Sequence, residues 1–248
     1  MSSVGTWAWA ERTGGRLRRR DRAELLRQGV LAQLSRMPAS LRRPLAEGLS
    51  LELPSPPDSA LARLAEQRVR ELSTPELYAH CMRTWAFATM FAARDRVRHD
   101  EELLYLACTL HDLGLTPAHD RADPTAHCFA VEGARAAHEL VCASGDQARA
   151  RLVAEAITLH LNVTVPARIG AEAQLLSKGV SLDTIGRRLH QLPRASVDRA
   201  DREWPRRAFA EQLVAATTRQ AEIRPRSRSA LLQRLGFVQM LRANPLER

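Results

Sequence analysis

The stretch EELLYLACTLHDLGLT, residues 101–116, combines an apolar helical pattern with an adjacent His-Asp pair at its end. His111 shares a helix face with Leu104 and Ala107, which precede it by seven and four residues. Asp112 follows at the C-terminal end of this predicted helix, where the helix dipole is already negative. An ionised carboxylate in apolar surroundings needs a partner, and a metal ion would supply the opposite charge. An Asp that points to solvent would also explain the dipeptide, so the pair alone leaves both interpretations open.

Helical patterns also surround this stretch on both sides. Aromatic residues make up only 4% of the 248 residues, and no alternating stretch is long enough for a strand. Proline and helix-capping residues set the borders of the predicted helices. These helices cover residues 22–36, 58–72, 75–95, 100–114, 129–143, 146–162, 171–190 with a break near Gly179, 205–223 and 228–242. The sequence therefore predicts an all-α fold.

The net charge of +9 is concentrated at the two ends of the chain. Residues 1–50 carry ten Arg and four acidic residues, and residues 219–248 carry seven Arg and two acidic residues. The middle of the chain is therefore slightly acidic. A surface that binds nucleic-acid phosphates would be expected to extend over the folded domain and not to be confined to the chain ends. We therefore expect no dedicated binding of nucleic acid.

The cysteines and the N-terminus indicate the compartment. Cys81, Cys108, Cys128 and Cys142 form no C-x-x-C pair and no zinc-finger spacing, which favours a reducing compartment. The N-terminus lacks the apolar core of a signal peptide, and no apolar run reaches the length of about 20 residues that a membrane span needs. We expect a cytoplasmic protein without membrane attachment, and a homo-oligomer is compatible with the sequence.

The stretch LPSPPD, residues 53–58, is the clearest linker in the chain. It separates a basic N-terminal extension, residues 1–55, from a helical domain that we expect over residues 56–215. Residues 216–248 are expected to form a basic C-terminal helical extension that packs on this domain. The Gly- and Arg-rich residues 1–21 are expected to be loose or to dock late in folding.

A second candidate ligand lies on the predicted helix that precedes the His-Asp pair. His80 belongs to a stripe with spacings of three and four residues, formed by Leu77, His80, Thr84, Phe87 and Phe91. Such a stripe is typical of the buried face of a helix. A histidine at this position is either hydrogen-bonded in the core or a metal ligand.

The ordered set of His80, His111-Asp112 and the later Asp183 resembles the HD-domain superfamily of metal-dependent hydrolases. In that superfamily a helical bundle presents one His, an adjacent His-Asp pair and a distal Asp to a divalent ion. The resemblance covers roughly residues 60–210 and implies an HD-type helical bundle. Three segments look like those of cyanamide hydratase-like HD proteins, namely HDLGLT (111–116), FAVEGARAA (129–137) and EAITLH (155–160).

The resemblance implies a centre with one divalent metal ion. His80, His111, Asp112 and Asp183 match its ligand positions. Two-metal members carry a further His four residues before a Gly-Ala pair, and Phe129 stands at that position here. Two His and two carboxylates suit zinc, which we favour, and also iron or manganese. Water activated by zinc can have a pKa near about 7, which suits attack on electrophilic carbon or phosphorus.

Three further histidines are candidates for acid–base chemistry. His160 follows apolar residues at three, four and seven positions before it, so its imidazole is predicted to point inward. Because its unperturbed pKa is about 6.5, it could move a proton at neutral pH, and we take His160 and Asp112 as the catalytic candidates. A core histidine bonded to a backbone carbonyl and a direct metal ligand are the alternatives for His160. His119 and His127 lie in the loop after the His-Asp pair, either at the mouth of the site or exposed.

These features predict a metal-dependent enzyme that adds water to a small polar substrate, as in cyanamide hydration. One alternative is a phosphohydrolase of nucleotides or other phosphomonoesters, which would need basic side chains near the metal. No basic residue between 99 and 182 stands immediately beside a ligand position. Another alternative is a non-catalytic HD module that binds a partner through the basic ends. The metal ligands would then be dispensable, although all four ligand types are present.

Overall fold

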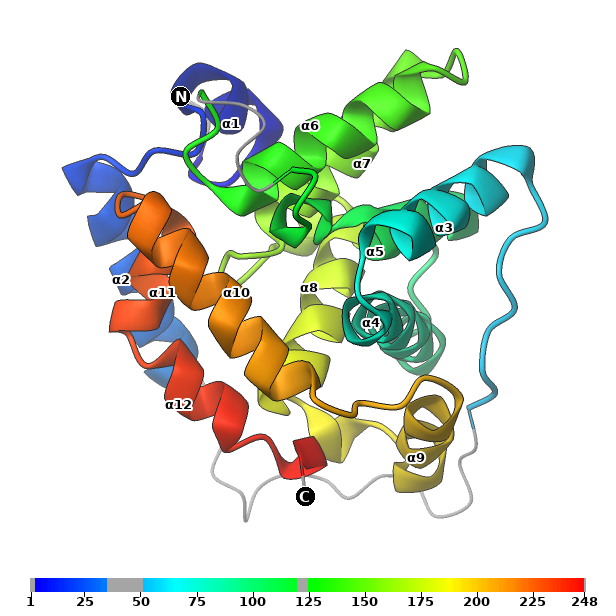
Figure 1. Ribbon diagram of the computed structural model, residues 1–248. Coiled ribbons are helices and arrows are strands. Elements are labelled where there is room, and N and C mark those ends of the chain that lie inside the picture. The colour runs from blue at the N-terminus through cyan, green and yellow to red at the C-terminus, as the bar shows by residue number, and fades with distance from the viewer. Residues whose placement is uncertain (1–2, 35–50, 120–124, 248) are drawn as a thin grey trace.

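The structure, a computed structural model, describes residues 3–34, 51–119 and 125–247, and the regular elements in these ranges are all helices (Figure 1). The prediction of an all-α fold is confirmed. No helix within the described ranges is both long and apolar enough to cross a membrane. The α-helices are α1 (Trp7–Thr13), α2 (Arg19–Leu34), α3 (Ala60–Leu72), α4 (Pro75–Asp95), α5 (Glu101–Leu110), α6 (Phe129–Cys142), α7 (Gln147–Leu159), α8 (Ala171–Ile185), α9 (Arg194–Glu203), α10 (Phe209–Ile223), α11 (Arg228–Arg234) and α12 (Phe237–Arg242).

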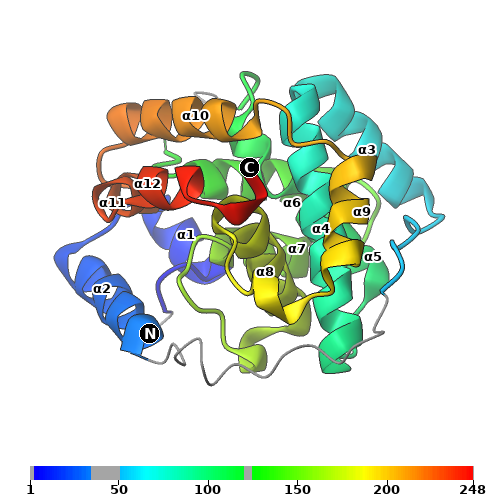
Figure 2. The same cartoon turned by 90° about the horizontal axis from the view of Figure 1, so that it is seen from below.

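Helices α4, α5 and α8 form the centre of the molecule. Phe87 and Phe91 of α4, Tyr105 of α5 and Leu175 of α8 belong to one buried apolar cluster. Helix α5 is enclosed on all sides, since residues 103–110 are all buried. Helices α3, α5 and α9 lie on one side of α8, whereas α2, α11 and α12 lie on the other (Figures 1 and 2).

Helix α8 runs through Gly179 without interruption, so the predicted break there is wrong. A Cβ atom at this position would lie 2.3 Å from the carbonyl oxygen of Thr84. The glycine therefore allows the backbones of α4 and α8 to approach closely, and it does not end the helix. One turn along each helix, the same crossing brings Asp183 of α8 beside His80 of α4.

Helix α1 is part of the core, so of the two expectations for this segment the loose one is wrong and docking agrees with the structure. Thr6 caps this helix, and Trp9 is only 2% exposed. Trp9 belongs to an apolar cluster with Leu25 of α2 and with Cys128 and Phe129 at the start of α6. Isolated tryptophans in a Gly- and Arg-rich stretch show no helical period, so the sequence pattern did not indicate this burial.

Helix α9 lies between the helices predicted over residues 171–190 and 205–223, so it was not predicted. Pro193 stands immediately before α9, a position where its missing N–H costs no helical hydrogen bond. The expected division of the chain into residues 1–55, 56–215 and 216–248 stays a prediction.

Candidate metal centre

Five buried polar residues converge where α4, α5, α7 and α8 meet. His80 comes from α4, His111 and Asp112 follow α5, His160 follows α7, and Asp183 lies near the end of α8. None of these five residues is more than 5% exposed. Buried groups of this kind need specific partners, because an unpaired charge or polar atom inside a protein is costly.

His80, His111 and Asp112 form a group that could hold a metal ion, here called the metal triad. The Nε2 atoms of the two histidines lie 3.2 Å apart. Oδ2 of Asp112 lies 3.4 Å from Nε2 of His80 and 3.2 Å from Nε2 of His111. Tetrahedral ligands at about 2.0–2.1 Å from zinc lie about 3.3–3.4 Å from one another. The three donor atoms therefore have the spacing of one face of a tetrahedral metal site.

The remaining ring nitrogens of both histidines are already hydrogen-bonded, which directs the Nε2 lone pairs toward the metal triad. Nδ1 of His111 donates to the carbonyl oxygen of Cys108 at 2.7 Å. Nδ1 of His80 donates to the carboxylate of Asp183 at 2.6 Å. Two lone pairs facing each other repel unless a proton or a metal ion lies between them. A hydrogen bond from the second ring nitrogen, like those to Cys108 and Asp183, is usual for histidines that bind metals.

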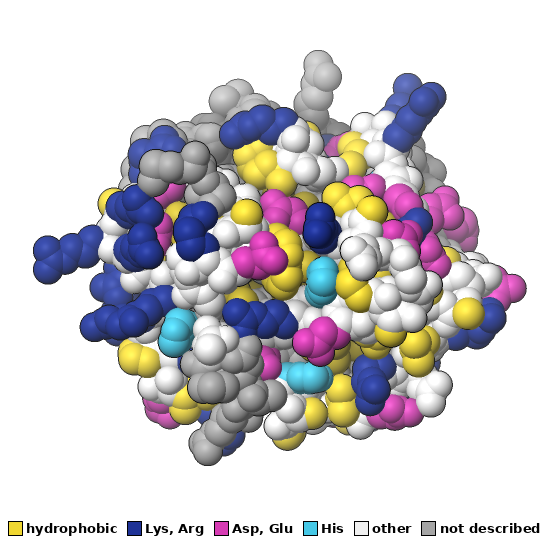
Figure 3. Space-filling view, turned by 90° about the horizontal axis from the view of Figure 1, so that it is seen from above, with side chains coloured by type: hydrophobic (Ala, Val, Ile, Leu, Met, Phe, Trp, Pro, Cys, Tyr) yellow, Lys and Arg dark blue, Asp and Glu magenta, His cyan; other side chains and the backbone are white. Residues whose placement is uncertain are grey.

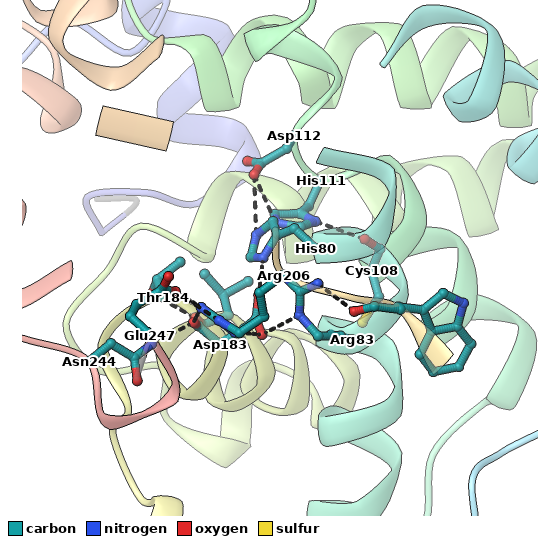
Figure 4. A network of polar contacts seen from close by, with 12 residues as sticks. His80, Arg83, Cys108, His111, Asp112, Asp183, Thr184, Arg206, Asn244 and Glu247 are labelled. Carbon is teal, nitrogen blue, oxygen red and sulfur yellow. Dashed lines mark hydrogen bonds and ion pairs between the residues drawn. The ribbon is translucent and has the colours of Figure 1, made fainter. Parts of the chain in front are cut away.

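Asp183 faces the opposite nitrogen of His80 and lies outside the metal triad (Figure 4). Its Oδ1 accepts hydrogen bonds from Nε of Arg83 at 2.8 Å and from Nη1 of Arg206 at 2.6 Å. Its Oδ2 accepts a further bond from Nη2 of Arg83 at 3.0 Å. The structure thus brings three of the four expected ligands to one point and places the fourth behind His80, where a carboxylate orients the imidazole.

The C-terminal residues support Asp183 from the other side. Nη2 of Arg206 donates to the backbone carbonyl of Asp183 at 2.7 Å and to the carboxylate of Glu247. Nδ2 of Asn244 also donates to the carbonyl of Asp183, at 2.8 Å. The chain end is therefore connected to the metal triad through Arg206, Asp183 and His80.

The two arginines that hold Asp183 were not identified from the sequence. Arg83 is 0% exposed and lies three residues after His80, on the same buried side of α4. An arginine beside an apolar helix stripe could have indicated a buried ion pair. Arg206 gave no comparable signal, because it stands at the start of the helix predicted over residues 205–223, whereas in the structure it precedes α10.

The electrostatic field at the metal triad favours positive charge. Burial lowers the pKa of the His111 imidazole, but the Asp112 carboxylate and Cys81 together outweigh this effect and raise the pKa to about 10. His80 behaves in the same way, because Asp112 and Asp183 raise its pKa despite burial. Burial raises the pKa of Asp112, but both imidazoles together lower it well below its usual value. The carboxylate thus stays ionised and attracts a cation.

His160 faces the same carboxylate from the end of α7. Its Nδ1 donates to the carbonyl oxygen of Ile157 at 2.6 Å, so its Nε2 carries the free lone pair. Nε2 lies 3.8 Å from Oδ1 of Asp112. Burial and the neighbouring His111 lower the pKa of His160 to about 3, which keeps the imidazole neutral. The backbone bond expected of a core histidine is thus present together with an orientation toward the metal triad.

The two loop histidines lie away from the metal triad. His119 is half-buried, and burial lowers its pKa while Glu139 of α6 opposes the shift. His127 borders a surface cleft of about 600 Å³ that is lined mainly by arginines of the N-terminal segment, together with Arg226. Figure 3 shows Lys and Arg side chains gathered on one side of the upper face. Phe129 stands at the sequence position where two-metal members of the superfamily carry a further histidine. Its ring centroid lies 5.9 Å from that of His160.

The metal triad opens into a cavity of about 480 Å³. His80, Asp112 and His160 line one part of its wall, together with Phe129. Side chains from α2, α8, α10, α11 and α12 line the rest, and most of them are apolar. The site is therefore a buried polar end of a largely apolar cavity, the usual form of a small-molecule site.

Comparisons with known proteins agree with this geometry. The HD domain family matches residues 77–202, a range that contains the metal triad, His160 and Asp183. The cyanamide hydratases DDI2 and DDI3 of Saccharomyces cerevisiae are each 31% identical to the chain over 159 residues, which cover 61% of this chain and 68% of each relative. The resemblance noted in the sequence is thus confirmed, and the chain belongs to the HD-domain family.

Proposed function

We propose that this protein is a metal-dependent hydratase that adds water to a carbon–nitrogen triple bond. The observation that carries the proposal is the metal triad, of which His80 and Asp112 line the wall of a partly open cavity, with the neutral His160 imidazole beside them. The similarity to the two yeast cyanamide hydratases supports this chemistry. The reaction converts R–C≡N and water into the amide R–CO–NH₂.

The donor set fits a divalent ion. Two imidazole nitrogens and one carboxylate oxygen suit zinc, and they also suit iron or manganese. Three protein ligands leave a coordination position for water or substrate, as in catalytic zinc sites. When bound, the ion supplies Lewis-acid activation of water and of the nitrile nitrogen. We propose one ion, since Phe129 lines the cavity at the place where a second ion would need a histidine.

Residues of the chain orient the ligands and move the protons. Asp183 holds the His80 ring and its tautomer through the bond to Nδ1. The neutral Nε2 of His160 can take a proton from the attacking water as the O–C bond forms, and can then deliver that proton to the nitrile nitrogen. The resulting imidic acid becomes the amide when its O–H proton moves to nitrogen. Asp112 serves both as a ligand and as the carboxylate that faces His160.

Phosphomonoester hydrolysis is less well supported. Arg187 supplies the only Lys or Arg side chain among the described residues that line the cavity, and its Nη1 donates to the carbonyl of Val163 at 2.9 Å. Arg83 and Arg206 are engaged by Asp183. A phosphomonoester would thus bring two negative charges into a cavity whose described lining residues include a single Lys or Arg side chain.

Parallel assays of the purified protein test the proposal. Elemental analysis should give about one divalent ion per chain. Urea formation from cyanamide should be detected, whereas a nucleotide panel should release no phosphate. The variant His160→Gln should lose turnover, while the matched control His99→Gln, which changes a histidine outside the cavity wall, should keep it. Phosphate release without urea formation would replace the proposal with the phosphohydrolase alternative.

A further inference from the structure

We infer that the substrate is an uncharged nitrile with an apolar substituent, such as an N-alkyl or N-aryl cyanamide, rather than cyanamide itself. This inference rests on the proposed hydratase function and names its substrate class. It is carried by the size of the cavity, by the chemistry of its wall and by the exposed side chains at its edge.

The cavity is far larger than cyanamide requires. Its volume is about 480 Å³, whereas a water molecule in the liquid takes up about 30 Å³. Cyanamide has only three non-hydrogen atoms and would leave most of this space to water. Cavities of about 300–1,000 Å³ usually hold ligands of drug-like size. The volume therefore indicates a substituent on the reacting group.

The part of the wall beyond the metal triad is suited to an uncharged hydrocarbon group. Leu25 of α2, Val180 of α8, Leu213 of α10, Leu232 of α11 and Phe237 of α12 all contribute to it. The polar lining residues of these helices carry hydroxyl groups. Asp112, a member of the metal triad, is the one acidic residue among the described lining residues. A negatively charged substituent would meet Arg187 as the one Lys or Arg side chain among the described lining residues, and this side chain already donates to the carbonyl of Val163, whereas an apolar substituent would bury its surface favourably.

Exposed apolar side chains also gather at this cavity. Large hydrophobic residues that remain exposed include Leu26 at 43%, Leu235 at 49% and Met240 at 38%, and all three line the cavity. They come from α2, the end of α11 and α12, which lie on the same side of α8 (Figures 1 and 2). A bound apolar substituent would cover part of these side chains. Contiguous exposed apolar surface of this kind is typical of binding sites.

The reaction balances without any further reactant. For a substituted cyanamide, R–NH–C≡N and water give the urea R–NH–CO–NH₂. One O–C bond forms, the triple bond becomes a single bond, and both hydrogens of water end on nitrogen after tautomerisation. The substituent R takes no part in the chemistry and contributes binding energy alone.

A substrate series tests the inference. Cyanamide is compared with its N-methyl, N-butyl and N-benzyl derivatives and with an N-carboxypropyl derivative as a charged control of similar length. Since a buried methylene contributes about 0.8 kcal/mol, kcat/KM should rise about fourfold per methylene until the cavity is filled. The charged control should gain less than the N-butyl derivative. Equal or falling kcat/KM along the apolar series would overturn the inference.

Two pairs of variants connect the effect to the cavity. Leu235→Ser and Met240→Ser should lower the ratio of kcat/KM for N-benzylcyanamide to that for cyanamide by about fivefold. Leu64→Ser and Leu152→Ser are matched controls, because these leucines are 46% and 55% exposed but do not line the cavity. They should leave the ratio unchanged. An equal change in both pairs would contradict the assignment of this wall.

Binding of the products separates failure of the inference from failure of the proposed function. Titration calorimetry of the metal-loaded protein with N-methyl-, N-butyl- and N-benzylurea should show increasing affinity and a negative heat-capacity change. If the ureas show this trend but no nitrile is hydrated, the cavity inference stands and the hydratase proposal fails. If cyanamide is hydrated but neither rates nor affinities rise with the substituent, the hydratase proposal stands and the inference fails.

Discussion

Asp112 and Asp183 are both buried beside His80, but their surroundings differ in the source of positive charge. Asp183 forms ion pairs with Arg83 and Arg206, and these arginines lower its pKa well below the usual value despite burial. Among the described residues, Asp112 has only histidines as possible cationic partners. One carboxylate is thus neutralised by the protein, whereas the other is arranged to meet a metal ion. In the function that we propose, the same residue type supports a ligand in one place and is itself a ligand in the other.

The comparison predicts the largest functional loss for Asp112→Asn. An amide cannot supply the negative charge that holds the ion, so the metal-to-protein ratio should fall from near one to near zero and turnover should be lost. The metal-free variant should lose less of its free energy of unfolding than Asp183→Asn, because its histidine partners can become neutral whereas arginines stay charged. Elemental analysis and urea denaturation measure the two effects. Full metal occupancy in the variant would remove Asp112 from the metal triad.

The variant Asp183→Asn should lose more stability and less metal binding than Asp112→Asn. Removal of the carboxylate leaves the buried Arg83 without its ion pair and Arg206 with Glu247 as its remaining carboxylate, which should lower the free energy of unfolding by about 3–5 kcal/mol. Metal affinity should fall by about 10- to 100-fold, since His80 loses the carboxylate that orients it. Asp95→Asn is the matched control, because Asp95 pairs with Lys178 at the surface and its loss should cost at most about 1 kcal/mol. If Asp183→Asn and Asp95→Asn were destabilised equally, the buried ion pairs of Asp183 would not be the source of its stabilising effect.

His160→Gln should affect turnover without affecting metal content. A glutamine keeps a similar length but cannot accept and release a proton, so kcat should fall by about 10²-fold or more. Elemental analysis and cyanamide turnover are measured together. Loss of metal would identify His160 as a ligand. Normal turnover with normal metal content would leave it as a core histidine bonded to the Ile157 carbonyl.

The smallest effect is expected for Glu247→Gln at the chain end. Arg206 would lose one carboxylate partner but would keep Asp183, so metal affinity should fall by no more than about tenfold. Glu52→Gln is the control, because Glu52 pairs with Arg199 on the surface, remote from the metal triad. Competition with a chelator gives both affinities. A loss as large as that of Asp183→Asn would mean that the chain end itself holds His80 in place.

Much of the helical framework could be predicted because its signals are local. Helices were predicted over residues 75–95 and 100–114, and the side chains of Thr74 and Asp100 cap them by accepting hydrogen bonds from the backbone N–H groups of Leu77 and Leu103. Gly179 shows where such signals fail. A glycine inside a helical pattern predicts a break in the helix, whereas here Gly179 allows the contact between α4 and α8. The difference depends on a neighbour almost a hundred residues away, which no local pattern contains.

The sequence by itself determined the all-α class, the HD-family resemblance and the histidines and carboxylates from which the site is built. These properties follow from helical periodicity and from residue type, which are local. Only the tertiary structure decided that Asp183 contacts Arg83 and Arg206, that His160 faces Asp112 and that α2, α11 and α12 help to enclose an apolar cavity. Each of these contacts joins residues from different helices. Their charges and surfaces are compensated through space, so the role of each buried carboxylate was set by the packing of the helices around it.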